Sequence, residues 1–176
     1  MSDFSIFYVF VQALGILAMG LEIWGTRYKD DRKMILWAAA SAGVYVVHFI
    51  CLGAFAGAAA DALGALRCVA SQYKKSAYLS FVFVLAYVAF AFFTADGLID
   101  MLPFIGGMIS TLAMFHLSGI RMRAVFILTI GLWFIYTVYY FSIGGMLLCL
   151  FLTIGYMRTI LKMRHDDVRD VDVMPL

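Results

Sequence analysis

The chain has 176 residues, of which 65% are hydrophobic and 14% charged, with a formal net charge of +2. Soluble globular domains carry about 25% charged residues, so this composition, with a mean hydropathy of +0.96, excludes a soluble protein. The three cysteines lie inside apolar runs without CxxC or metal-ligand spacing, which argues against a disulfide framework. The sequence therefore predicts an all-α membrane protein.

The first long apolar runs predict three membrane spans. One is expected at residues 4–24, and because no basic residue precedes it, we expect it to be retained rather than cleaved as a signal peptide. The uncharged stretch after the first basic loop is too long for one crossing of about 30 Å of hydrocarbon. It is therefore expected to form a hairpin that turns at Gly53 and Gly57, with spans at 34–53 and 57–74.

Four further spans are expected in the rest of the chain. The fourth, at residues 76–94, precedes an acidic loop, and the fifth runs from Leu102 to Ile120. A second long uncharged stretch again requires a turn, which we expect at residues 142–145. The total is seven spans, followed by a charged, apolar-poor tail at 163–176 that we expect to be disordered and cytoplasmic.

The basic residues predict the orientation. All 13 Lys and Arg residues fall in four clusters, at residues 27–33, 67–75, 121–123 and 158–169. With seven spans, these clusters lie on one side of the membrane, and Lys and Arg next to spans are retained in the cytoplasm. We therefore expect a multi-pass protein of the cytoplasmic membrane with its N-terminus outside and its C-terminus inside.

The two halves of the chain follow the same plan, which predicts an internal repeat. Residues 1–75 and 99–162 are each expected to form three helices, joined by a linking helix and outer loop at 76–98. Parallel repeats of this kind, in a 3-1-3 layout, are a known transporter architecture. One ungapped offset of 91 residues aligns Gly15 with Gly106, Arg32 with Arg123, Tyr45 with Tyr136, Gly53 with Gly144, Gly64 with Gly155 and Arg67 with Arg158.

Several short stretches resemble a known family. Residues 47–49 (VHF), 102–106 (LPFIG), 122–123 (MR) and 142–146 (SIGGM) are similar to the bacterial inner-membrane YgjV family, over about residues 11–164. The resemblance implies a bacterial cytoplasmic membrane and carries over no site residue. The layout is more loosely similar to 3-1-3 carriers of the SWEET/PQ-loop and PnuC types, although this chain has no Pro-Gln dipeptide.

Asp61 is the polar residue that is most costly to place in a membrane. It is expected about two turns into the third span, either as a proton- or ion-coupling carboxylate or a substrate contact, or as a wetted or protonated group near the interface. On the same helix, Ala56, Ala60 and Gly64 form a small-residue ladder that suits close helix approach. Such a face serves packing within the chain or a homo-oligomer.

A substrate site is expected around Tyr45 and His48, which share one helical face. The offset of 91 places Tyr136 and Tyr139 at the equivalent positions of the sixth span. These side chains either line a central cavity or serve as aromatic-belt and bundle contacts. Three mid-span residues are expected to join the candidate substrate site: Gln12, Ser110 and Trp133.

Other polar groups and motifs point away from catalysis. Glu22 lies close to Trp24 at the expected inner interface, so we expect it to pair with Arg27. The chain contains no HExxH, GxSxG or Walker motif, and its three histidines are scattered. We therefore expect no enzyme, cofactor or metal site. The basic clusters are explained by topology, so no nucleic-acid partner is expected.

The leading functional hypothesis is a carrier for a small uncharged or weakly charged solute, alternating its access between two three-helix bundles. The alternative is a non-transporting integral membrane protein that binds or assembles a partner. A carrier requires a continuous polar cavity, with Tyr45, His48, Tyr136 and Gln12 converging on open volume at mid-depth. A structural protein would pack the same axis dry with Gly, Ala and Phe.

Overall fold

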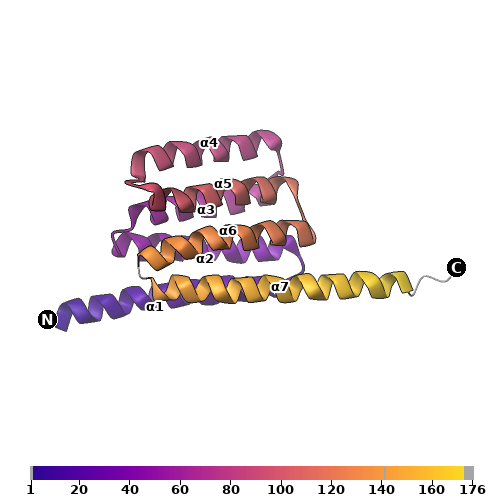
Figure 1. The fold of residues 1–176 in the computed structure, drawn as a ribbon, viewed down its shortest axis with the longest axis horizontal. Coiled ribbons are helices and arrows are strands. Elements are labelled where there is room, and N and C mark those ends of the chain that lie inside the picture. Colours follow the sequence, from indigo (N-terminus) through magenta and orange to yellow (C-terminus); the bar gives the residue numbers. More distant parts are fainter. Residues whose placement is uncertain (1, 141, 173–176) are drawn as a thin grey trace.

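The computed structural model describes residues 2–140 and 142–172, which form an all-helical bundle (Figure 1). This confirms the predicted all-α class. The seven helices are α1 (Ser2–Thr26), α2 (Asp31–Cys51), α3 (Phe55–Tyr73), α4 (Ala77–Thr94), α5 (Leu98–His116), α6 (Gly119–Tyr139) and α7 (Ile143–Asp172). At about 1.5 Å per residue, a helix of 21 residues such as α2 measures about 31 Å, the thickness of a bilayer core.

Six of the seven helices are long and apolar enough to cross a membrane, and α3 is the exception. Its alanines, Asp61 and Arg67 lower its apolar character. In the structure α3 nevertheless runs beside α2, α4 and α5 (Figure 1). Since its neighbours shield much of its surface from lipid, α3 does not need the composition of a lipid-facing helix. The predicted seventh crossing stays a prediction.

The reversals of the chain lie close to the predicted turns. Gly53, between α2 and α3, has a φ of +73°, a left-handed conformation that glycine adopts without strain. Gly57 lies inside α3 rather than in the turn. Helix α7 begins at Ile143, so Gly145 is helical and does not lie in the turn. A Cβ on Gly145 would lie 3.1 Å from Cβ of Thr137, which explains the need for glycine there.

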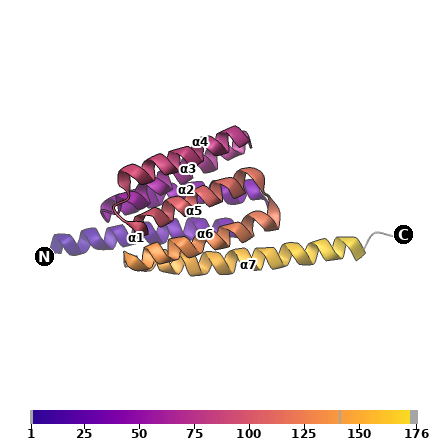
Figure 2. The ribbon, with the colours of Figure 1, turned by 45° about the horizontal axis from the view of Figure 1, so that its top comes forward.

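Six helices form a closed ring in the order α1, α2, α3, α5, α6, α7, because each packs against the next and α7 packs against α1. Figures 1 and 2 show this ring as two layers, with α5, α6 and α7 in front of α3, α2 and α1. The remaining helix, α4, packs on α3 and α5 at the edge of the ring. The ring therefore has an interior that α4 borders from one side.

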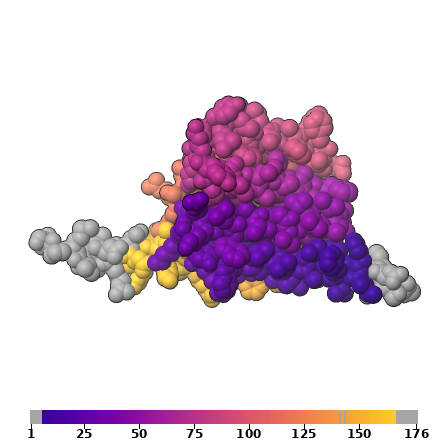
Figure 3. Space-filling model, turned by 180° about the vertical axis from the view of Figure 1, so that it is seen from behind, coloured from indigo at the N-terminus to yellow at the C-terminus, as the bar shows by residue number. Residues whose placement is uncertain are grey.

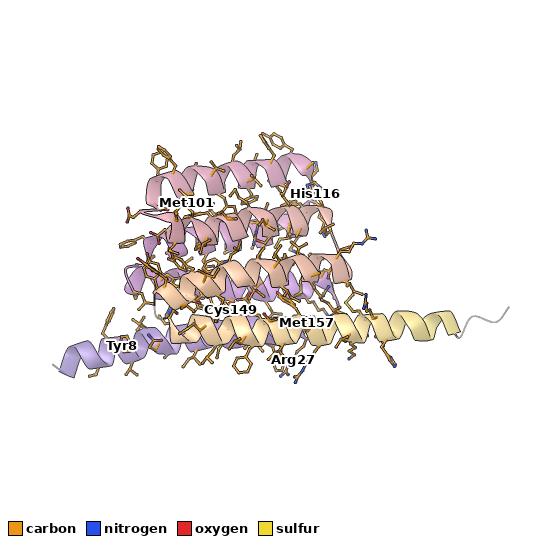
Figure 4. The ribbon with its side chains drawn as sticks, viewed as in Figure 1. Tyr8, Arg27, Met101, His116, Cys149 and Met157 are labelled. Atoms are coloured by element: carbon orange, nitrogen blue, oxygen red, sulfur yellow. The ribbon has the colours of Figure 1, made fainter. Side chains whose placement is uncertain are left out.

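We define two ends of the bundle by their loops. The basic end carries the loops after α1, α3 and α5, with Arg27, Lys29 and Lys74. The acidic end carries the loops after α2, α4 and α6, with Asp96. Figure 4 shows Arg27 and His116 toward the basic end, and Tyr8 and Met101 toward the acidic end.

The outer surface of the bundle is apolar, as a lipid bilayer requires. Large exposed hydrophobic side chains cover α1 and α4, among them Phe10, Ile16, Phe81, Leu85 and Phe92. From behind, the N-terminal half forms most of the surface, from indigo α1 to magenta α4 (Figure 3). These helices have lipid as their natural neighbour.

Two expectations about the ends and faces differ from the structure. Helix α7 continues to Asp172 through most of the segment 163–176 that we expected to be disordered, and residues 173–176 lie outside the described part. The small-residue ladder Ala56, Ala60 and Gly64 is buried inside the chain, where it packs beside Tyr87. Because α4 covers it, this ladder is not free to hold a second copy.

Candidate functional site

A cavity of about 150 Å³ lies inside the bundle, and all seven helices contribute to its lining. Three ionisable side chains that carry formal charge line it, namely Glu22 from α1 and Asp61 and Arg67 from α3. The other lining residues include hydroxyl and aromatic side chains: Tyr45, Phe49, Tyr87, Ser110, Thr129, Trp133, Thr137 and Tyr156. The axis of the ring is therefore hollow, and its lining is mostly apolar, with Gly, Ala and Phe residues beside the charged and hydroxyl groups.

Glu22 lies at mid-depth, and its expected pairing with Arg27 is wrong. The Ser41 hydroxyl lies 3.1 Å from Oε2 of Glu22 and 2.8 Å from the carbonyl oxygen of Ala18. Ser41 is the middle residue of α2, so Glu22 is level with the centre of the bundle. Arg27 instead places its guanidinium 4.7 Å from the centre of the Trp24 ring.

Arg67 reaches into the bundle instead of joining the cytoplasmic cluster in which the sequence placed it. Its side chain is 8% exposed, and its Nη1 lies within hydrogen-bond distance of three oxygens of α5. These are the carbonyl of Gly107 at 2.8 Å, Oγ of Ser110 at 2.5 Å and Oγ1 of Thr111 at 3.0 Å. Since Gly107 is the middle residue of α5, the guanidinium also lies near mid-depth.

Asp61 faces the same cavity from α3, half-buried. Among the described residues, no salt bridge joins Asp61, Glu22 or Arg67 to any partner. Asp61 therefore lies on the interior side of its helix, as a coupling carboxylate would require. Its coupling role stays a prediction.

Three of the seven predicted substrate residues line the cavity: Tyr45, Ser110 and Trp133. Tyr45 is 4% exposed, and its hydroxyl has no hydrogen-bond partner among the described residues. Its ring stacks on Phe49 with centroids 5.7 Å apart, and Phe49 lies 6.3 Å from Trp133 at an interplanar angle of 25°. These three rings form an aromatic wall on one side of the cavity.

The other four predicted substrate residues lie elsewhere. His48 packs between α1 and α2, where its Nδ1 lies 2.8 Å from the carbonyl oxygen of Val11 and its ring fills the space that Gly15 leaves. Tyr136 is fully buried, and its hydroxyl accepts a hydrogen bond from the backbone N–H of Gly57 at 3.2 Å. The remaining two, outside the cavity lining, are half-buried Gln12 and exposed Tyr139.

Both ends of the bundle are tied by polar contacts. At the basic end, Arg123 is 0% exposed and donates from Nη1 to Oδ1 of Asp31 at 2.6 Å and from Nη2 to the carbonyls of Tyr28 and Lys29 at 3.1 Å. This fastens the loop after α1 to the start of α6.

At the acidic end, the Tyr140 hydroxyl donates to Oδ1 of Asp100 at 2.5 Å. This hydrogen bond, together with burial, raises the pKa of Tyr140 to about 12. Tyr140 therefore stays a neutral donor to Asp100 across the physiological pH range. The contact joins the start of α5 to the end of α6.

Metal binding finds no support in the described part of the chain, where no group of three or more His, Cys, Asp or Glu side chains is placed to hold an ion. Of the three charged lining residues, Asp61 was predicted, whereas Glu22 and Arg67 were missed because their proximity in sequence to a basic loop was taken to mean that they lie at the membrane interface. A signal for Glu22 was nevertheless present. It follows the small residues Gly15 and Ala18 at helical spacing, and both of these are buried against α2.

Comparison with known proteins returns a family and a relative. A family model described as a bacterial inner membrane protein, Imp-YgjV, matches residues 9–167. The inner membrane protein YgjV of Escherichia coli (strain K12) is 27% identical over 138 residues, which cover 78% of this chain and 75% of that protein. No solved structure matches the chain. The range that matches the family model includes every residue lining the cavity.

Proposed function

Since the chain belongs to the Imp-YgjV family of bacterial inner membrane proteins, as the resemblance predicted, we propose that it is a small-solute carrier that works by alternating access. It is an integral, multi-pass protein of that membrane. The observation that carries the proposal is the cavity at mid-depth, whose lining includes the ionisable side chains of Glu22, Asp61 and Arg67. Ionisable groups inside a membrane protein mark solute and ion pathways. The proposal assigns no catalytic step to the cavity.

The contacts of the ring support two parallel repeats, α1–α3 and α5–α7. Under a two-fold axis along the helices, the contact of α1 with α7 corresponds to that of α5 with α3, and both are present. The position of α4, outside the ring, is the one expected of a linking helix. Three pairs of residues 91 apart have both members in the cavity lining: Ala38 and Thr129, Ala42 and Trp133, Asp61 and Leu152.

The two tied ends suggest how access would alternate. Arg123 with Asp31 closes the basic end, and Tyr140 with Asp100 closes the acidic end. In the proposed cycle one tie breaks while the other holds, so the cavity never opens to both sides together. The positive-inside rule assigns the basic end to the cytoplasm, which puts the N-terminus outside.

The test fills the cavity without changing the surface. Ala42 lines the cavity, whereas Ala40 on the same helix is exposed. Ala42→Phe therefore blocks the site, and Ala40→Phe is the matched control. Untargeted metabolite profiles are compared between cells that lack the protein and cells that overproduce each form, with equal membrane content verified. We expect the wild type and Ala40→Phe to shift the same small metabolites and Ala42→Phe to shift none.

A different outcome would favour the non-transporting alternative. If blocking the cavity leaves the metabolite profile of overproducing cells unchanged from the wild type, the carrier proposal fails. The same holds if overproduction of the wild type shifts no metabolite at all. A partner-binding protein would instead lose its function through changes on the lipid-facing or loop surfaces.

A further inference from the structure

We propose that the cavity binds a small organic monocation, such as a protonated amine, through Glu22 and Asp61. This inference rests on the proposed function, because it takes the cavity as the solute site. It narrows the uncharged or weakly charged solute expected from the sequence to a monocation, since that expectation did not place Glu22 or Arg67 in the cavity.

The first argument is charge. Two carboxylates and one guanidinium line the cavity, and no salt bridge involves any of them within the described part of the chain. In their ionised forms these groups sum to one net negative charge. Uncompensated charge in a low-dielectric interior is costly. Either a proton on one carboxyl group or a solute with a single positive charge would complete the balance, and a protonated amine can supply both the charge and the hydrogen-bond donors.

The second argument is the hydrogen bonding of Arg67. Its Nη1 is engaged by three oxygens of α5. Its Nε is buried and has no partner among the described residues. The Tyr87 ring also lies 5.8 Å from the guanidinium carbon. Arg67 is thus held against α5 through one nitrogen, and this single positive charge among the lining residues makes no salt bridge with Glu22 or Asp61.

The third argument is the aromatic wall of Tyr45, Phe49 and Trp133. An ammonium group that reached an open face of Tyr45 or Trp133 at either end of this row would be attracted by the ring quadrupole. Tyr45 adds a hydroxyl that is buried, lines the cavity and has no partner in the described residues. Such a hydroxyl is costly unless it is hydrogen-bonded, and its oxygen can accept a bond from an ammonium N–H.

The size of the cavity limits the solute. An apolar cavity of roughly 150 Å³ binds benzene in another protein, and the cavity here is about 150 Å³. We therefore expect solutes comparable to benzene with a few added atoms. Benzylamine, which is protonated at pH 7, suits this size. Benzyl alcohol is a neutral probe of nearly identical shape, and benzoate is an anionic one.

The experiment measures equilibrium binding of the three probes to the full chain in lipid nanodiscs, with empty nanodiscs subtracted. We expect saturable binding of benzylamine at least about tenfold tighter than that of benzyl alcohol, because hydrogen bonds to charged groups are the stronger ones. We expect no binding of benzoate. Binding of the alcohol or benzoate as tightly as the amine, or no binding of the amine, would overturn the inference.

Variants locate the site. Glu22→Gln and Asp61→Asn keep the shape of each side chain and remove its charge, and each is expected to weaken benzylamine binding about tenfold. Asp96→Asn, at an exposed loop position, is the control and should leave it unchanged. Unaltered binding in both cavity variants refutes the assignment, and the wild-type probe comparison decides the matter even if a variant does not fold.

The two proposals fail in different ways. If Ala42→Phe abolishes the metabolite shift while benzoate or benzyl alcohol outcompetes benzylamine, the carrier stands and the monocation is wrong. If benzylamine binds as expected but Ala42→Phe leaves the metabolite profile intact, the cavity is a cation site in a protein that does not transport through it.

Discussion

Gly107→Ala tests whether α4 and α5 are packed as closely as the structure shows. A Cβ at Gly107 would lie 2.6 Å from Cζ and 2.8 Å from Cδ1 of Tyr87, well inside van der Waals contact. Tyr87 is 1% exposed, so its ring has little room to move. Extra methyl groups in packed interiors cost about 1–3 kcal/mol. Helix propensity opposes this by about 0.5–1 kcal/mol, because alanine is the better helix former.

Gly131→Ala is the matched control, since a Cβ at this mid-helix position of α6 meets nothing within 4 Å. Alanine raises helix propensity equally in both variants. The difference between their free energies of unfolding therefore measures the steric cost at Gly107, about 1–3 kcal/mol. For a chain of this size that corresponds to a difference in melting temperature of about 2–12 °C. Thermal unfolding of both variants in one mild detergent at one heating rate measures it. Equal melting temperatures would refute the close contact of Gly107 with Tyr87.

Three further outcomes are expected. Arg123→Met should lower the free energy of unfolding by about 3 kcal/mol, because it leaves the Asp31 carboxylate and two loop carbonyls without their donor. Arg121→Met, at an exposed position, should change the free energy of unfolding little, and thermal unfolding compares the two variants. Tyr140→Phe should cost about 1–3 kcal/mol through the carboxylate it leaves unpaired, measured in the same way. Reporters fused after residue 75 should behave as cytoplasmic and those after residue 97 as external; the reverse pattern would overturn the proposed orientation.

Helix number and turn positions were accessible from the sequence because they depend on local properties. The length of an apolar run sets the number of crossings, and Gly53 marks a reversal because its backbone adopts a positive φ. Both properties can be read without knowing which helices meet. Four basic residues, Arg27, Lys29, Lys74 and Lys75, lie in loops, and the other basic residues lie within helices.

The direction in which each polar side chain points was less accessible, because it depends on partners far along the chain. His48 faces α1 because Gly15 leaves space for its ring. Arg67 turns inward because α5 offers three oxygens at its level, 40 or more residues away. Tyr45 and Tyr136 occupy equivalent positions of the proposed repeat, yet only Tyr45 lines the cavity. No periodicity within one helix contains this information.

The closed ring also has a consequence for biogenesis. The helix that completes the ring is the last of the seven described helices to be synthesised. It docks on the first, where the Thr159 hydroxyl donates to the Thr26 carbonyl oxygen at 2.7 Å. Until α7 has left the ribosome, the cavity that Glu22 lines lacks the side chains of α7, so Glu22 is exposed to lipid or to the insertion machinery. A nascent chain truncated before α7 would therefore expose an acidic side chain within the bilayer, a defect that membrane quality control can recognise.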